Sequence, residues 1–291
     1  MKLATMTRTL ERKFGLKKAI KMLKDAGFDA YDCSLGYAMT HGEFSGDDAL
    51  EKAQEIRKYS DELGISCVQT HTPSHASDLK GIKYFLDGIE NEKLAVEISG
   101  ILGAEVAVVH PTSITDAEGN YDMLYSKLIP IAKKYGLKIA CENMFAWKNK
   151  LTIDIETVPT ACGYSRDFVR QVDLANDETM VACLDIGHCH LPNNEKFEDM
   201  VKALGNKRLK ALHVNDNNMR DDQHVFPFFG KINWDMVCKT LAEIDYSGNF
   251  TFETDPFMDK YPDELIPECL TLLEKTGRYL ISKLEEYKKN K

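Results

Sequence analysis

Short apolar runs alternate along this chain with longer stretches in which apolar residues recur every three or four positions. The longer pattern is typical of amphipathic helices. It predicts helices over Leu16–Ala26, Asp47–Leu63, Ile82–Leu102, Tyr121–Tyr135, Ser165–Leu174, Glu195–Leu204, Trp234–Ile244 and Glu264–Tyr287. Glycine directly follows four of these helices, where helices commonly end, at Gly27, Gly64, Gly103 and Gly136.

The apolar runs are nearly all hydrophobic, as in strands that are covered on both faces. They predict strands over Leu3–Met6, Phe28–Ser34, Ile65–Thr70, Val106–Val109, Leu137–Cys141, Met180–Leu184, Leu209–Leu212 and Asn249–Phe252. Strict strand–helix alternation indicates a parallel sheet. Eight such units in 291 residues favour a closed (β/α)8 TIM barrel, an α/β fold, as a single domain over residues 1–291.

An open, doubly wound sheet is the alternative, and it would place a glycine-rich phosphate-binding turn after the first strand. Residues 7–14 contain no glycine. The longest irregular stretch, Asn143–Tyr164, lies inside the repeat and is the size of a loop that covers a substrate.

Composition narrows the class of protein. The net charge of −9 and the pI near 5.5 argue against a broad nucleic-acid surface. The eight cysteines form no CxxC pair, and four lie in apolar runs, so we expect reduced thiols and a cytoplasmic location. The first residues contain no apolar signal core, and no apolar run is long enough to span a membrane.

The run from Val181 to His188 carries the first sign of chemistry. It predicts a buried strand that ends in Asp185, turns at Gly187 and presents His188. Aspartate oxygen and histidine nitrogen are both common ligands of divalent metals.

Other predicted strands end in the same residue types, and in a barrel all carboxyl ends of the strands meet at one mouth. A single histidine or glutamate at a strand end is usually a satisfied polar residue. Six separate strands with such ends favour one shared site, made of His71, His110, Glu142, Asp185, His188, His213 and Glu253. Buried carboxylates are costly unless paired or metal-bound. We therefore expect one divalent ion, Mn, Co, Mg or Zn, bound by Glu142, Asp185, His213 and Glu253.

These segments resemble the xylose isomerase-like TIM barrel superfamily, which includes the sugar phosphate isomerase/epimerase family, inosose dehydratases and, more distantly, endonuclease IV. The resemblance covers nearly the whole chain. It is carried by His71-Thr-Pro, Val109-His-Pro, Cys141-Glu-Asn, Leu184-Asp-Ile-Gly-His, His213-Val-Asn-Asp, Asp222-Gln-His and Phe252-Glu.

The resemblance implies a metal-dependent isomerase or epimerase that acts on a sugar, a polyol or a sugar phosphate, with no organic cofactor. Glu142 and Glu253 would be the two acid/base catalysts, moving a proton through a metal-bound enediolate. His188 would hold a substrate oxygen, with His71 and His110 also in the substrate site.

Two positions depart from the ketose 3-epimerase pattern. Lys148 stands where those enzymes carry a glutamate, and Met219, followed by Arg220, stands where they carry an arginine. Lys148 and Arg220 are either solvated charges or contacts to an anionic substrate group. Trp147, in the same loop as Lys148, could stack on a sugar.

Three alternatives stay open. A dehydratase or lyase would begin with the same proton abstraction. An endonuclease IV-like phosphodiesterase with several zinc ions would use Asp222 and His224 as additional ligands, and all nine of its ligand positions have a match here: His71, His110, Glu142, Asp185, His188, His213, Asp222, His224 and Glu253. A silent sugar-binding module is disfavoured because both glutamates are present. The sequence predicts no membrane or nucleic-acid partner and leaves a homo-oligomer open.

Overall fold

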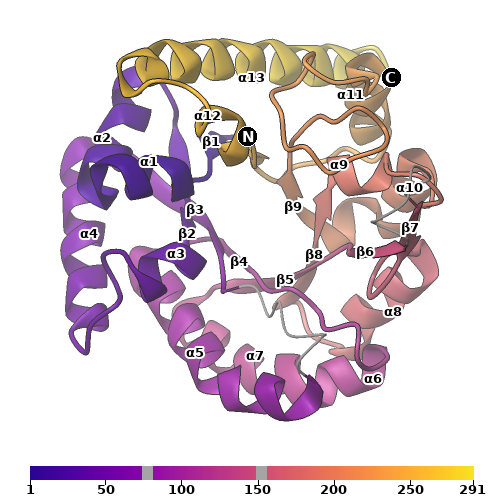
Figure 1. Ribbon diagram of the computed structural model, residues 1–291. Coiled ribbons are helices and arrows are strands. Elements are labelled where there is room, and N and C mark those ends of the chain that lie inside the picture. The colour runs from indigo at the N-terminus through magenta and orange to yellow at the C-terminus, as the bar shows by residue number, and fades with distance from the viewer. Residues whose placement is uncertain (74–80, 149–155) are drawn as a thin grey trace.

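A computed structural model describes residues 1–73, 81–148 and 156–291; within these, the side chains of residues 81–87, 147–148 and 156–159 lie outside the description. Eight parallel strands surround a common axis (Figure 1). They are β1 (Leu3–Thr5), β2 (Ala30–Ser34), β3 (Ser66–His71), β4 (Val106–Val108), β5 (Lys138–Glu142), β8 (Met180–Asp185), β9 (Leu209–His213) and β10 (Phe250–Phe252).

The strands close into a ring. Strands β2, β3, β4, β5, β8 and β9 form one continuous sheet in that order, and β1 pairs with β10. Parallel bridges between Met6 and Asp32 and between Val214 and Phe252 join these two sheets on both sides. The predicted closed (β/α)8 barrel is confirmed.

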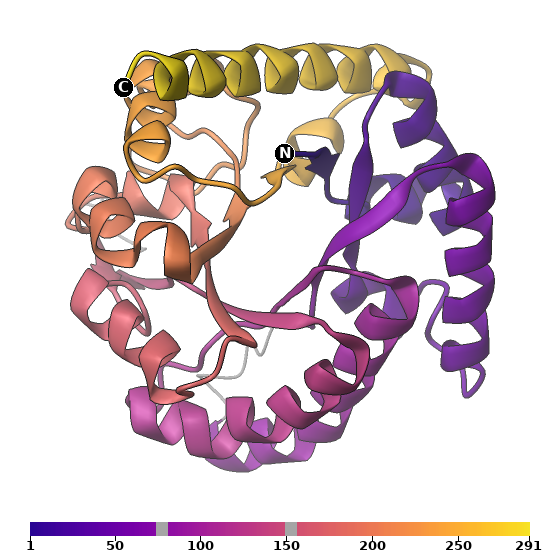
Figure 2. The same ribbon diagram turned by 180° about the vertical axis from the view of Figure 1, so that it is seen from behind.

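Helices form the outer layer, as the view from behind also shows (Figure 2). The main helices of this layer are α2 (Leu16–Ala26), α4 (Ala49–Leu63), α5 (Gly81–Leu102), α7 (Ser126–Tyr135), α8 (Ser165–Leu174), α10 (Phe197–Arg208), α11 (Trp234–Glu243) and α13 (Ile266–Lys289). Helix α13 packs against α11 and α2, so the last helix lies beside the first repeat. Among the described residues, no helix has the length and apolar character that crossing a bilayer requires.

The core has two layers, because successive side chains of a strand point to opposite faces of the sheet. The large outer layer joins strands to helices and includes Leu184, Leu212 and Phe252. A separate inner cluster lies inside the barrel and consists of Val106, Val108, Ala140, Val181, Cys183 and Ala211. All eight cysteines are buried free thiols.

The structure adds elements that the periodicity did not predict. Short helices occur after several strand ends: α1 (Arg8–Phe14), α3 (Leu35–Thr40), α6 (Ala117–Asn120), α9 (Ile186–Cys189) and α12 (Asp255–Met258). The expected helix Tyr121–Tyr135 begins with a π-helical turn, Tyr121–Tyr125. The stretch expected to be irregular contains an antiparallel pair, β6 (Phe145–Lys148) and β7 (Glu156–Pro159), so that expectation was wrong. Backbone hydrogen bonds between the two strands form this pair, and the side-chain pattern along the sequence did not predict it.

Candidate metal centre

Four candidate ligands converge at the carboxyl-terminal mouth of the barrel. Glu142, Asp185 and His213 are the last residues of β5, β8 and β9, and Glu253 directly follows β10. All four are buried, with at most 8% of each residue exposed. One ligand atom from each lies within 4.8 Å of those of the other three. The structure thus brings together the four residues that the sequence singled out.

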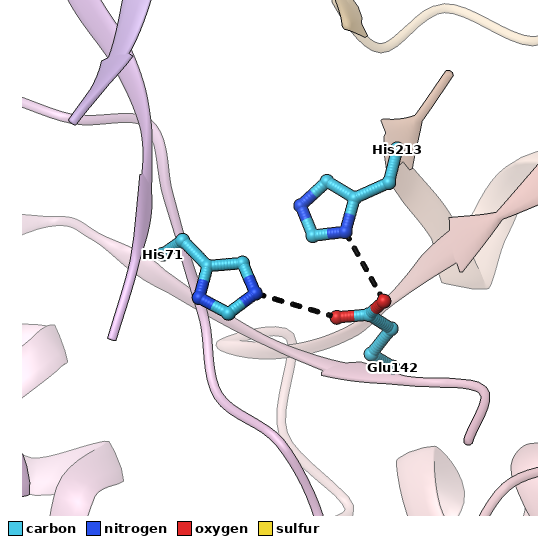
Figure 3. Close-up of side chains that lie close together, drawn as sticks. All are labelled: His71, Glu142 and His213. Atoms are coloured by element: carbon cyan, nitrogen blue, oxygen red, sulfur yellow. Dashed lines mark ion pairs between the residues drawn. The ribbon is translucent and has the colours of Figure 1, made fainter. Parts of the chain in front are cut away.

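His213 lies between the two glutamates. Its Nδ1 atom is 3.1 Å from Glu142 Oε1 and 3.1 Å from Glu253 Oε2. Figure 3 shows the His213 ring directed at the Glu142 carboxylate. Within the described part of the chain, Glu142 Oε2 and both His213 ring nitrogens form no hydrogen bond of good geometry. Buried polar atoms rarely lack a hydrogen-bond partner, so these atoms indicate that a group binds at this cluster.

The charges of this cluster fit a divalent cation. Burial opposes ionisation of Glu142, but His213 and His110 outweigh it and hold its pKa well below the usual value. Burial also opposes ionisation of Glu253, but the charges of His213, His224 and His71 outweigh burial and lower its pKa. Burial raises the pKa of Asp185 to about 6. Three clustered carboxylates with one imidazole are an oxygen-rich donor set, and a cation would replace the positive charge that protonated histidines otherwise supply.

Local sequence holds Asp185 in place. Asp185 Oδ1 accepts a hydrogen bond from His188 N at 2.7 Å, because Asp185 caps the short helix α9. Asn215 Nδ2 donates to Asp185 Oδ2 at 2.8 Å. A Cβ atom at Gly187 would collide with the Asn215 side chain, so glycine is needed there for Asn215 to reach the carboxylate.

His71 and His110 lie on the other side of Glu142. His110 Nε2 is 3.0 Å from Glu142 Oε2 and 3.0 Å from His71 Nε2. His71 Nε2 is 3.8 Å from Glu142 Oε2 (Figure 3). Burial and the neighbouring His110 lower the pKa of His71 to about 4, so His71 is neutral and keeps a nitrogen lone pair for a ligand. His71, Glu142 and His213 form a second group with ligand atoms within 4.8 Å.

A third group consists of Asp185, His188 and His224, with Asp222 beside it. Asp222 Oδ2 is 3.1 Å from His224 Nε2 and 3.7 Å from His188 Nε2. Burial lowers the pKa of His224, but Glu253 and Asp222 outweigh it and raise the pKa to about 10. The four-residue group shares Glu142 and His213 with the second group and Asp185 with the third. His110 adjoins Glu142 and Asp222 adjoins His224, so the nine candidate positions form one continuous cluster.

Besides Asn215, two more residues that support the site had been given no role from sequence. Asn143 exchanges two hydrogen bonds with Asp185, donating to its carbonyl oxygen at 3.0 Å and accepting from its N–H at 2.7 Å. The Asn143 carbonyl oxygen lies 2.8 Å from His188 Nδ1, which orients that ring. Asp216 is buried and accepts from the backbone of the β9–α11 loop and from Trp234 Nε1 at 2.8 Å. Both are polar residues within three positions of a candidate ligand in the sequence. This proximity was the signal from which a supporting role could have been predicted.

The remaining predicted substrate contacts are less defined. Lys148 and Trp147 belong to β6, but their side chains lie outside the described residues. Arg220 is exposed in the β9–α11 loop.

Comparison with known proteins identifies the family of this chain. Residues 20–274 match the family described as xylose isomerase-like TIM barrel. The chain therefore belongs to that family. It is 31% identical over 190 residues to an uncharacterized protein of Methanocaldococcus jannaschii, a match that covers 62% of this chain and 61% of that protein.

Solved structures share the whole fold. A D-tagatose 3-epimerase-like protein superimposes with a TM-score of 0.74 at 21% identity, covering 100% of this chain and 99% of the other. The IOLI protein with a bound zinc atom superimposes with a TM-score of 0.72 at 19% identity, covering 99% of each chain. At these identities the likeness establishes the fold.

Proposed function

We propose that this protein is a divalent-metal-dependent isomerase or epimerase of a sugar, polyol or sugar phosphate. The observation that carries the proposal is the four-residue group Glu142, Asp185, His213 and Glu253, whose ligand atoms lie within 4.8 Å of one another. Family membership supports it, as do structural neighbours that are named as a sugar epimerase-like protein and as a zinc-bound IOLI protein.

Glu142, Asp185, His213 and Glu253 would hold the metal, and Mn, Co, Mg and Zn all suit this donor set. When bound, the cation would polarise the substrate carbonyl and stabilise the negative charge that develops on its oxygen. No organic cofactor is needed for a proton transfer of this kind.

Glu142 and Glu253 would move the proton. Both are held ionised by histidines, so each can accept a proton from a carbon next to a carbonyl. They come from β5 and from the end of β10, which are not adjacent strands, and reach His213 Nδ1 from different strands. Removal of a proton by one glutamate and its return by the other on the opposite face would invert that carbon.

His71, His110 and His188 would position the substrate. Their rings line the cluster and are largely buried, with 8–16% of each side chain exposed, and His71 is neutral. His188 is fixed through Nδ1 by the Asn143 carbonyl oxygen, which leaves Nε2 directed toward Asp222. Such fixed rings can hydrogen-bond hydroxyl groups while excluding bulk water.

Two other reactions use the same groups. A dehydratase or lyase would start from the same proton abstraction and expel a β-hydroxyl. A phosphodiesterase with several metal ions is favoured by one observation, the flanking groups His71–Glu142–His213 and Asp185–His188–His224. Two or three ions held there could clamp a phosphodiester and activate water.

Metal content separates these proposals. Protein purified without chelator or added metal should contain about one divalent ion per chain by elemental mass spectrometry if a single four-ligand site operates. It should then exchange solvent deuterium into at least one member of a panel of ketoses, polyols and sugar phosphates. Two or three zinc ions per chain with cleavage of abasic DNA would replace the isomerase by the phosphodiesterase. Protein that neither contains nor takes up metal would overturn both.

A further inference from the structure

A cavity lies at the opposite end of the barrel from the candidate metal centre. It has a volume of about 640 Å³, within the range of small-ligand sites. It opens where β5, β8 and β9 begin, and its walls include Lys138, Met180 and Lys210 from these strands and Asp173 and Arg208 from helices α8 and α10. The candidate ligands lie at the other ends of the same three strands.

We propose that this cavity binds a small molecule through a phosphate or another dianionic group, held between Lys138 and Lys210. This site is independent of the proposed reaction.

A β-bulge places Lys210. Ala182 of β8 pairs with Leu209, and the next residue, Cys183, pairs with Ala211, so Lys210 is the extra residue of β9. Leu209 belongs to the outer core and Ala211 to the inner cluster, which shows that strand alternation is interrupted at Lys210. Bulges redirect a side chain, and they are frequent at barrel rims and binding sites.

The two lysines repel each other. The pKa of Lys210 is lowered by partial burial and by the charge of Lys138. Lys138 Nζ donates to the carbonyl oxygen of Glu178 at 2.9 Å, a neutral acceptor that leaves its charge uncompensated. For Lys210 Nζ, no hydrogen bond or ion pair occurs within the described residues. An anion between the two ammonium groups would relieve this repulsion.

Two of the three acidic residues of the cavity wall form ion pairs with basic side chains. Arg208 holds Asp173 with two bonds of 2.8 and 2.7 Å. Asp177 forms an ion pair with Lys133. The hydrogen bonds from Lys133 and from the Thr179 N–H lower the pKa of Asp177 to about 2. The exposed Glu178 carboxylate is the third acid of the wall, and Lys207 adds another cation. The wall thus has four basic and three acidic residues, a local excess of positive charge on a chain of net charge −9. Such a local positive potential attracts anions.

The choice of a dianion follows from this geometry. Two separate ammonium groups are point charges that suit a tetrahedral phosphate with several oxygens. The cavity is larger than one phosphate, so it can also accept the organic part of a phosphate ester.

The test is a titration of the protein with inorganic phosphate and with pyrophosphate by calorimetry, at constant ionic strength set with sodium chloride. Wild type, Lys210→Gln, Lys210→Arg and Lys202→Gln are compared. Lys202 is an exposed lysine of α10, paired with Glu243, and serves as the matched control. Each titration is repeated on the Asp185→Asn variant, which weakens the candidate metal centre.

Saturable binding that falls at least fivefold in Lys210→Gln, while Lys210→Arg and Lys202→Gln keep it, is the expected result. Binding that persists in Lys210→Gln but disappears in Asp185→Asn would place the anion at the metal centre and overturn the proposal. Equal, non-saturating heats in all variants, or no binding to wild type, would also overturn it. Circular dichroism of each variant excludes loss of fold as the cause.

Discussion

Gly187 and Asn215 are packed so closely that the glycine has no room for a Cβ atom, and Asn215 thereby reaches the Asp185 carboxylate. We predict that Gly187→Ala displaces Asn215 and frees Asp185. Metal affinity should fall by roughly 10- to 100-fold, as expected when a partner that orients a ligand is lost. Competition with a fluorescent chelator measures this change.

Gly36→Ala is the matched control. A Cβ atom at Gly36 would lie 3.7 Å from Pro73 Cα, an ordinary contact, and Gly36 lies in helix α3. This variant should bind metal as wild type does. Equal metal affinity in Gly187→Ala and wild type would show that the Asn215 contact does not support the site.

The second prediction concerns the two glutamates. Glu142→Gln and Glu253→Gln keep the size of each side chain but remove a base, so each should reduce solvent deuterium exchange into a substrate by at least about 10²-fold. Exchange is followed by NMR, with metal supplied in excess so that weakened binding does not mask the effect. Glu62→Gln, on the exposed face of α4, should exchange at the wild-type rate. Undiminished exchange in both glutamine variants would rule out the two-carboxylate mechanism.

Asp216 supports the loop that carries Asp222 and His224. It accepts hydrogen bonds from Phe228 N at 2.9 Å and Ile232 N at 3.1 Å, in addition to Trp234 Nε1. Asp216→Ala should lower the free energy of unfolding by roughly 2–4 kcal/mol, because several buried donors lose their acceptor. Urea denaturation measures this loss.

Asp47→Ala, at an exposed position, should change that free energy by less than about 0.5 kcal/mol. If Asp216→Ala were as stable as Asp47→Ala, the loop would be held by its other contacts instead.

Glu11 gives a prediction about pH. Burial raises its pKa from 4.5 to about 7, assisted by the charge of Glu43 and opposed by the hydrogen bond from the Glu43 N–H. The folded protein therefore holds a proton that the unfolded chain releases above about pH 4.5. The stability from this group is complete below pH 4.5 and is lost as pH rises toward 7.

Glu11→Gln stays neutral at every pH, so it should gain stability relative to wild type as the pH rises, by roughly 1–3 kcal/mol at pH 8. Urea denaturation at pH 5 and at pH 8 measures the difference. Glu62→Gln should differ from wild type by the same small amount at both values. A Glu11→Gln difference that does not change with pH would mean that Glu11 is ionised in the folded protein.

The sequence determined the barrel and the set of residues at its mouth. Alternating helical and apolar periods fix parallel strand–helix units, and closure of eight such units brings every strand's carboxyl end to one face. For this reason Glu142, Asp185 and His213, far apart along the chain, could be assigned to one site from their positions at strand ends. No knowledge of loop shape was needed.

Tertiary structure alone decided the details that a period of two cannot express. A bulge adds one residue to β9 and places Lys210 in the wall of the cavity. The strand pairing that produces the bulge involves backbone groups that are distant in the sequence. Asn215 reaches Asp185 only because β8 and β9 are neighbours and Gly187 leaves space. The β6–β7 pair likewise arises from backbone hydrogen bonding between its own strands. These features depend on which strands and loops meet in space, and side-chain periodicity along one segment carries no information about that.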